Sequence, residues 1–240
     1  MDYQYSYLLM DMVMFAIWLF LFIWRKDVRK EMLIISLIVS LAGFAEPIYY
    51  RDWWRPVTIT NTIPGVESVL WAFCWGGIVG VIYEELFKKK IRAKKLSKIE
   101  YEIQTIKLME LLGLCFLILL AGVFLFNLNT LQSTILSFII GTAIIWAQRN
   151  DLIKESIITA LLSLLIMIPV FFITEQISPG MVQRFWLFQN VPRITMLYVP
   201  LDDIIFYLFG GAFFGPLYEY WQEARFVKLN KQKSKARTKA

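Results

Sequence analysis

The chain has 240 residues, of which 58% are hydrophobic and 18% are charged, with a formal net charge of +6 and a mean hydropathy of +0.56. This composition excludes a soluble globular domain and predicts an integral membrane protein with several spanning segments. Histidine is absent, which excludes imidazole acid–base catalysis, histidine-bound metals and the usual haem ligation.

Apolar runs predict an all-α fold, an integral membrane helical bundle of seven transmembrane helices. The runs cover residues 5–24, 32–50, 66–87, 106–126, 131–147, 153–173 and 201–221. The first run has Asp2 in front of it and no basic flank, so we expect a span there and not a cleaved signal peptide. Cys74 and Cys115 lie inside apolar runs, and we expect both to be buried core residues.

Lysine and arginine are concentrated in alternate connections, at residues 25–30, 88–98, 149–154 and 225–239. The positive-inside rule then places the N-terminus outside and the C-terminus in the cytoplasm, which requires an odd number of spans. Topology and anionic lipid headgroups account for the net positive charge. Because no folded basic surface is predicted, we expect membrane lipids and no nucleic acid as partners. The sequence leaves the oligomeric state open.

Two pairs of matching segments indicate an internal duplication. Residues 66–84 and 201–219 each begin just after a proline, carry carboxylates in the first turn and end in Gly-x-x-x-Gly-x-x-Tyr-Glu. Residues 25–31 and 149–155 share Arg-x-Asp-x-x-Lys-Glu. Spans one to three and five to seven would then be two three-helix repeats of parallel topology, with span four as the connecting helix.

This duplication divides the chain into four parts. We expect a first three-helix repeat with a cytoplasmic basic loop over 1–100, a connecting helix over 101–128, a second three-helix repeat over 129–224 and a basic disordered tail over 225–240. Duplicated units in membranes usually frame one shared site at their interface.

The third span of each repeat carries a small-x-x-x-small motif, Gly76/Gly80 and Gly211/Gly215. Such motifs let two helices approach closely, so we predict that spans three and seven touch through these four glycines.

Two glutamates lie at the cytoplasmic ends of these spans, where the helix dipole disfavours an acid. We predict that Glu84 pairs with Arg25 or Lys30 and that Glu219 pairs with its counterpart, Arg149 or Lys154. For Glu84, Lys88 at i+4 is a local alternative partner.

Three acids in the first turns of spans three and seven, Glu67, Asp202 and Asp203, are the catalytic candidates. Acids are common at helix N-termini, so a purely structural role is equally compatible with the pattern. Their repetition beside aromatic residues favours a proton-transfer role. Glu46 lies on the same outer side and could join them. Two other intramembrane acids, Asp11 and Glu110, have no repeat partner and rank below these.

Aromatic residues make up 16% of the chain. Those near the outer face are expected to form an interfacial belt: Tyr49, Tyr50, Trp53, Trp54, Trp186 and Tyr198. Deeper aromatics are expected to bind substrate, namely Trp71, Trp75, Phe206 and Tyr207. A cavity walled by π faces stabilises a carbocation by cation–π attraction without supplying a nucleophile. We predict that the three acids converge on one such cavity, open to the outer leaflet.

The recurrence of a proline and nearby acids at the start of an aromatic-rich membrane helix resembles the lycopene cyclase domain of the heterodimeric bacterial carotenoid cyclases. The cyclase half of the fungal bifunctional phytoene synthases is similar. In the bacterial members two three-span subunits combine, and a fused form with a connecting helix would have seven spans. The resemblance covers about residues 5–221.

The family motif, typically Pro-x-Glu-Glu or Pro-x-Glu-Asp, falls on Pro200, Asp202 and Asp203 in the second repeat. In the first repeat it matches only at Glu67, because an extra residue follows the proline and Ser68 replaces the second acid. The second repeat also uses the shorter aspartates.

The resemblance implies a redox-neutral cyclisation of a lycopene end group, with no cofactor and no metal. An acid protonates the terminal double bond, the cation is attacked intramolecularly and a ring proton is lost. The substrate would be a hydrophobic carotenoid that enters from the bilayer. Two other functions fit the architecture: a non-catalytic isoprenoid or lipid binder, and a small-solute transporter with three spans on each side of a connector. A retinal protein is excluded because span seven contains no lysine.

Overall fold

The computed structural model describes residues 3–228, which form a helical bundle with short strands at its two ends. The longer helices are α1 (Ser6–Trp24), α2 (Arg29–Ser40), α4 (Val66–Val79), α6 (Lys98–Phe124), α7 (Thr130–Gln148), α8 (Ile153–Ile177) and α10 (Leu201–Phe214). The shorter ones are α3 (Glu46–Tyr49), α5 (Ile82–Phe87), α9 (Met181–Phe185) and α11 (Leu217–Gln222), with 3₁₀ turns η1 (Leu41–Ala45) and η2 (Asn150–Leu152).

Within the described chain, six helical segments are long and apolar enough to cross a membrane. They are Ser6–Trp24, Arg29–Tyr49, Val66–Phe87, Lys98–Phe124, Thr130–Gln148 and Asn150–Ile177. The seventh predicted span, 201–221, is helical as α10 and α11, which are separated by a turn at Gly215 and Pro216, and it is not among the six. The protein is therefore a mostly helical, membrane-embedded chain.

Helix boundaries follow local sequence signals. α6 begins at a capping box in which Ser97 accepts from the backbone N–H of Glu100 and the Glu100 side chain reaches back. Asn129 and Gln132 form the same arrangement at the start of α7. The third span of the first half is interrupted at Gly80, between α4 and α5.

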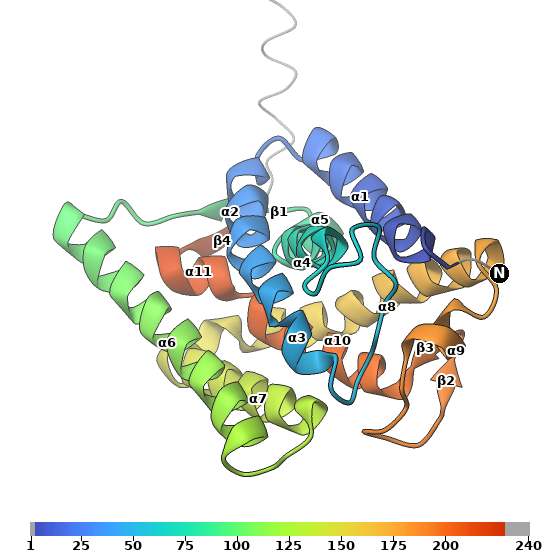
Figure 1. Ribbon diagram of the computed structural model, residues 1–240. Coiled ribbons are helices and arrows are strands. Elements are labelled where there is room, and N and C mark those ends of the chain that lie inside the picture. The colour runs from blue at the N-terminus through green and yellow to red at the C-terminus, as the bar shows by residue number, and fades with distance from the viewer. Residues whose placement is uncertain (1–2, 229–240) are drawn as a thin grey trace, which may run out of the picture.

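Two groups of helices make up the bundle (Figure 1). In the first, α4 packs against α1 and α2; in the second, α10 packs against α7 and α8. The α6 helix, drawn in green at the edge of Figure 1, packs along α7 and contacts α11. α4 and α10 meet between the two groups, so the N-terminal and C-terminal halves share one interior.

The prediction that the four glycines join α4 to α10 is wrong. In the first half these glycines face α2: a Cβ added to Gly76 would lie 2.4 Å from Cβ of Val39, and one added to Gly80 would lie 3.1 Å from Cγ2 of Ile35. These two glycines therefore give close helix packing within the first half of the bundle.

The second half repeats this geometry with α8 in place of α2. A Cβ on Gly211 would lie 2.8 Å from Cβ of Ser163, and one on Gly215 would lie 2.7 Å from Cγ2 of Thr159. The glycine motifs therefore bind α4 and α10 to the preceding long helix. Contact between α4 and α10 themselves is made by aromatic rings, such as Trp75 and Phe206 at 5.4 Å between centroids.

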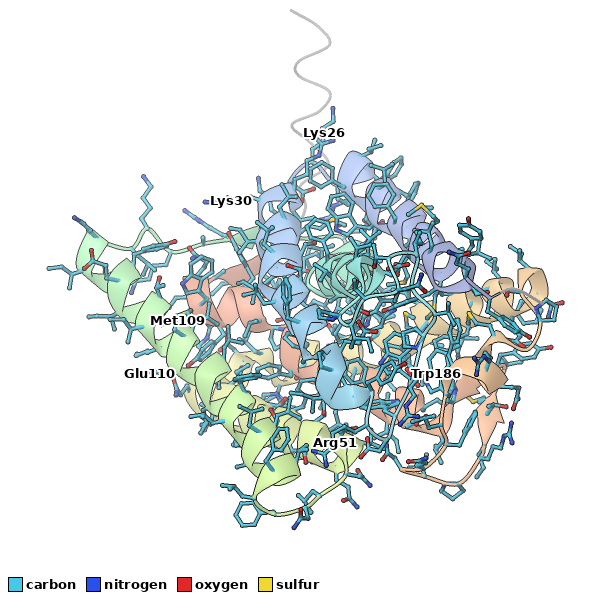
Figure 2. All side chains as sticks on the ribbon, in the orientation of Figure 1. Lys26, Lys30, Arg51, Met109, Glu110 and Trp186 are labelled. Carbon is cyan, nitrogen blue, oxygen red and sulfur yellow. The ribbon has the colours of Figure 1, made fainter. Side chains whose placement is uncertain are left out.

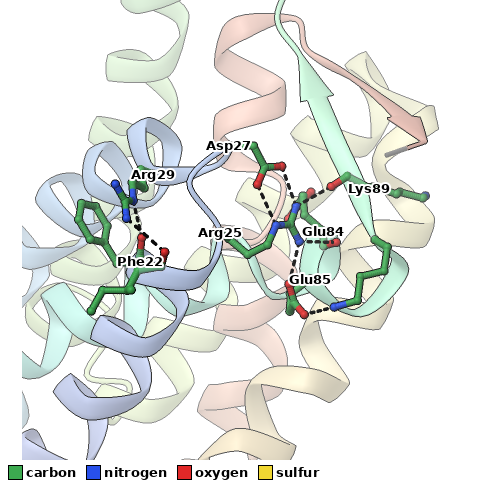
Figure 3. A network of polar contacts seen from close by, with 9 residues as sticks. Phe22, Arg25, Asp27, Arg29, Glu84, Glu85 and Lys89 are labelled. Atoms are coloured by element: carbon green, nitrogen blue, oxygen red, sulfur yellow. Dashed lines mark hydrogen bonds and ion pairs between the residues drawn. The ribbon is translucent and has the colours of Figure 1, made fainter. Parts of the chain in front are cut away.

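Two arginine clamps lie at one end of the bundle, and Figure 3 shows the first of them, at Arg25. Arg25 donates to the backbone carbonyl of Glu84 at 3.0 Å and to the carboxylate of Glu85 at 2.9 Å, and it binds Asp27 in a fork. Burial opposes ionisation of Asp27, but the hydrogen bonds from Arg25 outweigh it and hold the Asp27 pKa below its usual value. Lys88 pairs with Glu85 and not with Glu84.

The second clamp has the same form. Arg149 donates to the backbone carbonyls of Glu219 at 3.0 Å and Ala224 at 2.9 Å, and it also binds Asp151. Both predicted arginines therefore contact the predicted glutamates, but through the main chain. The carboxyl groups of Glu84 and Glu219 have no hydrogen-bond partner within residues 3–228.

Two strands outside the helices join the chain's halves at this same end. β1 (Lys89–Arg92) and β4 (Arg225–Lys228) pair antiparallel, so the first four residues of the predicted disordered tail form a strand. The rest of that tail, 229–240, lies outside the described residues. At the other end, β2 (Thr195–Met196) pairs with β3 (Val199–Pro200), directly before α10.

Candidate active site

A cavity of about 490 Å³ lies where α4 and α10 meet, between α1, α3, α6 and α7. Its wall is mostly apolar and aromatic. It contains six of the eight predicted site residues: Glu46, Trp71, Trp75, Asp203, Phe206 and Tyr207. The two other predicted acids, Glu67 and Asp202, are buried but do not line it.

The aromatic wall is built by stacking within and between helices. Trp71 and Trp75, one turn apart on α4, stack at 5.5 Å with an angle of 13° between the rings. Phe206 and Tyr207 on α10 lie against them at centroid distances of 5.4 to 6.1 Å. The Trp75 indole is held by a 3.1 Å hydrogen bond to Ser163. These rings offer π faces to any cation formed in the cavity.

Asp203 is the cavity's acid on the α10 side, placed in the first turn immediately after β3. Its Oδ2 accepts hydrogen bonds from the indole N–H groups of Trp53, at 3.5 Å, and Trp186. Tyr207, one turn further along α10, interacts with the same carboxyl group. Indole donors and a phenol thus fix the orientation of this carboxyl group within an otherwise apolar wall.

The prediction that Trp53 and Trp186 belong to the interfacial belt is wrong. Each is 5% exposed, each lines the cavity and each donates to Asp203. Tyr49 and Trp54 line it as well. The loops carrying these residues fold inward over the helix ends, and no periodic pattern in the sequence reports this.

Asp202 faces away from the cavity because adjacent residues on a helix point about 100° apart. Its Oδ1 accepts from the backbone N–H of Asp203 at 3.2 Å, and its Oδ2 has no partner in the described chain. The predicted convergence of three acids on the cavity is therefore wrong for Asp202.

Glu67 likewise lies behind the wall, where it orders the loop before α4. Its Oε1 accepts from the backbone N–H of Ile59 at 2.6 Å. Glu46, which does line the cavity, accepts from the N–H of Gly65 at 2.6 Å and keeps its other oxygen without a partner among residues 3–228. The first-half acid in the wall is therefore Glu46 and not Glu67.

Tyr7 and Ser68 add two hydroxyl groups to the cavity wall. The Tyr7 hydroxyl donates to Oγ of Ser68 at 3.0 Å, and both side chains are buried. Asp11, one turn after Tyr7, is fully buried, and neither of its oxygens has a partner in the described region. It acts electrostatically on Tyr7 and Glu67. The position of Asp11 inside an apolar run of the sequence marks it as a functional candidate.

Comparison with known proteins adds a family to this geometry. The family model described as lycopene cyclase matches residues 129–221, a segment that includes Asp202, Asp203, Phe206 and Tyr207. Glu46 and Glu67 lie outside the match. No curated protein and no solved structure matches the chain. The match of residues 129–221 to the lycopene cyclase family connects this membrane protein with carotenoid biosynthesis.

Proposed function

We propose that the protein is a membrane-embedded cyclase that converts an acyclic carotenoid end group, that of lycopene, into a ring. The observation that carries this proposal is Asp203: it belongs to the matched domain and is held by two indole N–H groups in the wall of an aromatic cavity. A cavity of about 490 Å³ is within the range of roughly 300–1,000 Å³ that is typical of small-molecule sites. This volume suits one end of a polyene chain.

The reaction transfers one proton in and one proton out, so it needs no oxidant, reductant or cofactor. A carboxylic acid protonates the terminal double bond and leaves a cation on the branched carbon. The neighbouring double bond attacks this carbon, a carbon–carbon bond closes the ring and the cation moves into it. Loss of a ring proton to a carboxylate restores a double bond. Trp71, Trp75 and Phe206 stabilise the cation through their π faces.

The two carboxyl groups in the cavity wall, Asp203 and Glu46, are assigned this acid–base work together. Glu67 and Asp202 become positioning residues, because their hydrogen bonds run to the backbone beside the wall. The mostly apolar wall favours a carotenoid over a polar solute, which weighs against the transporter alternative.

We place the cavity in the outer half of the membrane, in a chain of seven spans made of two parallel repeats with α6 between them. The contacts of α4 with α1 and α2 correspond to those of α10 with α7 and α8, which supports the repeat. The α10–α11 segment, 201–222, would be the seventh span. The clamps at Arg25 and Arg149 and the strands β1 and β4 share one end of the bundle, which positive-inside topology makes cytoplasmic.

The proposal is tested by expression in a host that accumulates lycopene, followed by pigment analysis. The wild-type chain should convert lycopene into cyclic carotenes, and Asp203→Asn should abolish conversion at equal membrane abundance. Glu110→Gln is the control, because Glu110 is exposed on the outward side of α6 (Figure 2) and should retain activity.

Unchanged lycopene with abundant, folded wild-type protein would contradict catalysis. Copurification of lycopene with that inactive protein would support the non-catalytic carotenoid-binding alternative.

A further inference from the structure

At the opposite end of α10–α11 from Asp203, four glutamates gather in the interior below the arginine clamps. They are Glu31 of α2, Glu84 of α5, Glu155 of α8 and Glu219 of α11, and none is more than 3% exposed. Asp203 and Glu219 are separated by roughly 24 Å of helix at 1.5 Å per residue, so this cluster is distinct from the cavity. Each acid occupies the same place as its counterpart in the duplicated motifs: Glu31 with Glu155, and Glu84 with Glu219.

Three of the four acids present oxygens to a common point. One carboxylate oxygen from each of Glu31, Glu84 and Glu219 lies within 4.8 Å of the other two. Glu155 acts electrostatically on Glu84 and Glu219 and adds a fourth acid to the group. Opposite ligands of a cation that binds oxygen at about 2.1–2.5 Å are about 4.2–5.0 Å apart. The spacing therefore suits a single divalent cation.

These oxygens have no other partner. Both carboxylate oxygens of Glu31, Glu84 and Glu219, and Oε2 of Glu155, are buried without a hydrogen-bond donor in the described chain. The side chains of Glu31 and Glu219 are close together, and a hydrogen bond between them would need a proton on one of the two carboxyl groups. Buried carboxylates without a counter-charge are strongly unfavourable, so the cluster must hold either protons or a cation, and the shared point between three carboxyl groups favours a cation.

The neighbouring arginine and lysine side chains do not bind these carboxylate oxygens. Arg25 and Arg149 exert an electrostatic effect on the cluster, but they donate their hydrogen bonds to aspartates, to Glu85 and to backbone carbonyls. Lys89 donates to the hydroxyl of Tyr83 at 2.8 Å and lies over that ring. Asp27 and the Tyr218 phenol also face this region. The neighbouring charges lower the cost of the excess negative charge and leave the central oxygens free.

We propose that Glu31, Glu84 and Glu219, with Glu155 beside them, bind one divalent cation of the Mg²⁺, Mn²⁺ or Ca²⁺ class. A ligand set made only of carboxylate oxygens selects these hard cations over zinc or copper. Because Glu31 and Glu84 belong to the first half of the duplicated sequence and Glu219 to the second, the bound cation ties the two halves together at the end where β1 and β4 pair.

The experiment uses the full chain, purified in detergent or nanodiscs and freed of metal with a chelator. MnCl₂, MgCl₂ and CaCl₂ are each titrated while the thermal midpoint is measured, and Mn²⁺ binding is followed by electron paramagnetic resonance. At 100-fold excess over Kd the midpoint should rise by about 5–10 °C. Glu219→Gln and Glu84→Gln should each weaken Mn²⁺ binding at least about tenfold.

Glu102→Gln is the matched control, since it makes the same charge change on the exposed side of α6 and should bind Mn²⁺ like the wild type. The wild-type binding measurement decides the proposal even if a variant fails to fold. Absence of any Mn²⁺, Mg²⁺ or Ca²⁺ effect on the wild type, with a higher midpoint for Glu219→Gln in metal-free buffer, would overturn it and show that the acids hold protons instead.

Discussion

Asp203 shows how the setting of a single residue decides its role. Two aspartates follow Pro200, yet only Asp203 lines the cavity, because the next residue on a helix points elsewhere. Its carboxyl group accepts from Trp53 and Trp186, two indoles carried by loops far apart in the sequence. Two indole donors to one carboxyl group hold that reacting group in one orientation.

We therefore predict that Trp186→Phe will lower the rate of ring formation although it keeps an aromatic ring in the wall. Loss of one donor to a buried carboxyl group costs about 1–3 kcal/mol, so turnover should fall about tenfold. Cyclic carotene formed per amount of protein in the lycopene-accumulating host measures this.

Trp54→Phe is the comparison, because Trp54 also lines the cavity, whereas Trp53 and Trp186 are the indoles that donate to Asp203. It should lose less activity than Trp186→Phe. Equal losses would mean that the volume of the ring matters, and not the donor to Asp203.

At the scale of helices, close packing between consecutive long helices organises each half. The glycines of α4 face α2, and those of α10 face α8, so each motif removes side-chain volume where two backbones approach. The interface between α4 and α10 instead has large aromatic rings, with a cavity among them. Tight packing within the halves leaves this looser aromatic interface available for a ligand.

Gly211→Ala should destabilise the protein, since the added Cβ would lie 2.8 Å from Cβ of Ser163 and 3.0 Å from the backbone of Ala160 and Thr159. Overpacking of this kind costs about 1–3 kcal/mol, and the thermal midpoint in detergent should fall by several degrees. Gly113→Ala on α6 is the matched control, because a Cβ there meets nothing within 4 Å. A midpoint unchanged in both variants would contradict tight packing of α10 on α8.

For the whole molecule, the two halves are joined at both ends of the bundle. Near the cavity, Asp203 of the second half accepts from Trp53 of the first. At the other end, β1 follows α5 and β4 follows α11, and the two strands pair antiparallel. The carboxylate cluster lies at that same end. Because Asp203 receives a donor from the first half, the matched segment 129–221 alone would lack part of the site.

A cross-link tests this arrangement and the topology together. Lys90 and Val227 are direct partners in the β1–β4 pair, and partners in antiparallel strands have Cα atoms about 4.5–5.5 Å apart, within disulfide range. Lys90→Cys with Val227→Cys should form a disulfide on mild oxidation, detected by mass spectrometry. Cys74 and Cys115 are buried and should not interfere.

Lys90→Cys with Glu102→Cys serves as the unpaired control and should not cross-link. In intact cells, Lys90→Cys alone should react with a membrane-impermeant maleimide only after permeabilisation. Labelling without permeabilisation would reverse the proposed orientation.

The sequence by itself determined the helical membrane class, six of the spanning helices, the likeness of residues 129–221 to the lycopene cyclase family and six of the residues that line the cavity. These follow from local hydropathy and from short motifs, which require no knowledge of neighbouring helices. Only the tertiary structure decided which helix the glycines contact, which acid of each half reaches the cavity and that Trp53 and Trp186 hold Asp203. It alone brought Glu31, Glu84, Glu155 and Glu219 together. Such contacts depend on helix rotation and on the path of loops, and neither is encoded in the period of a single segment.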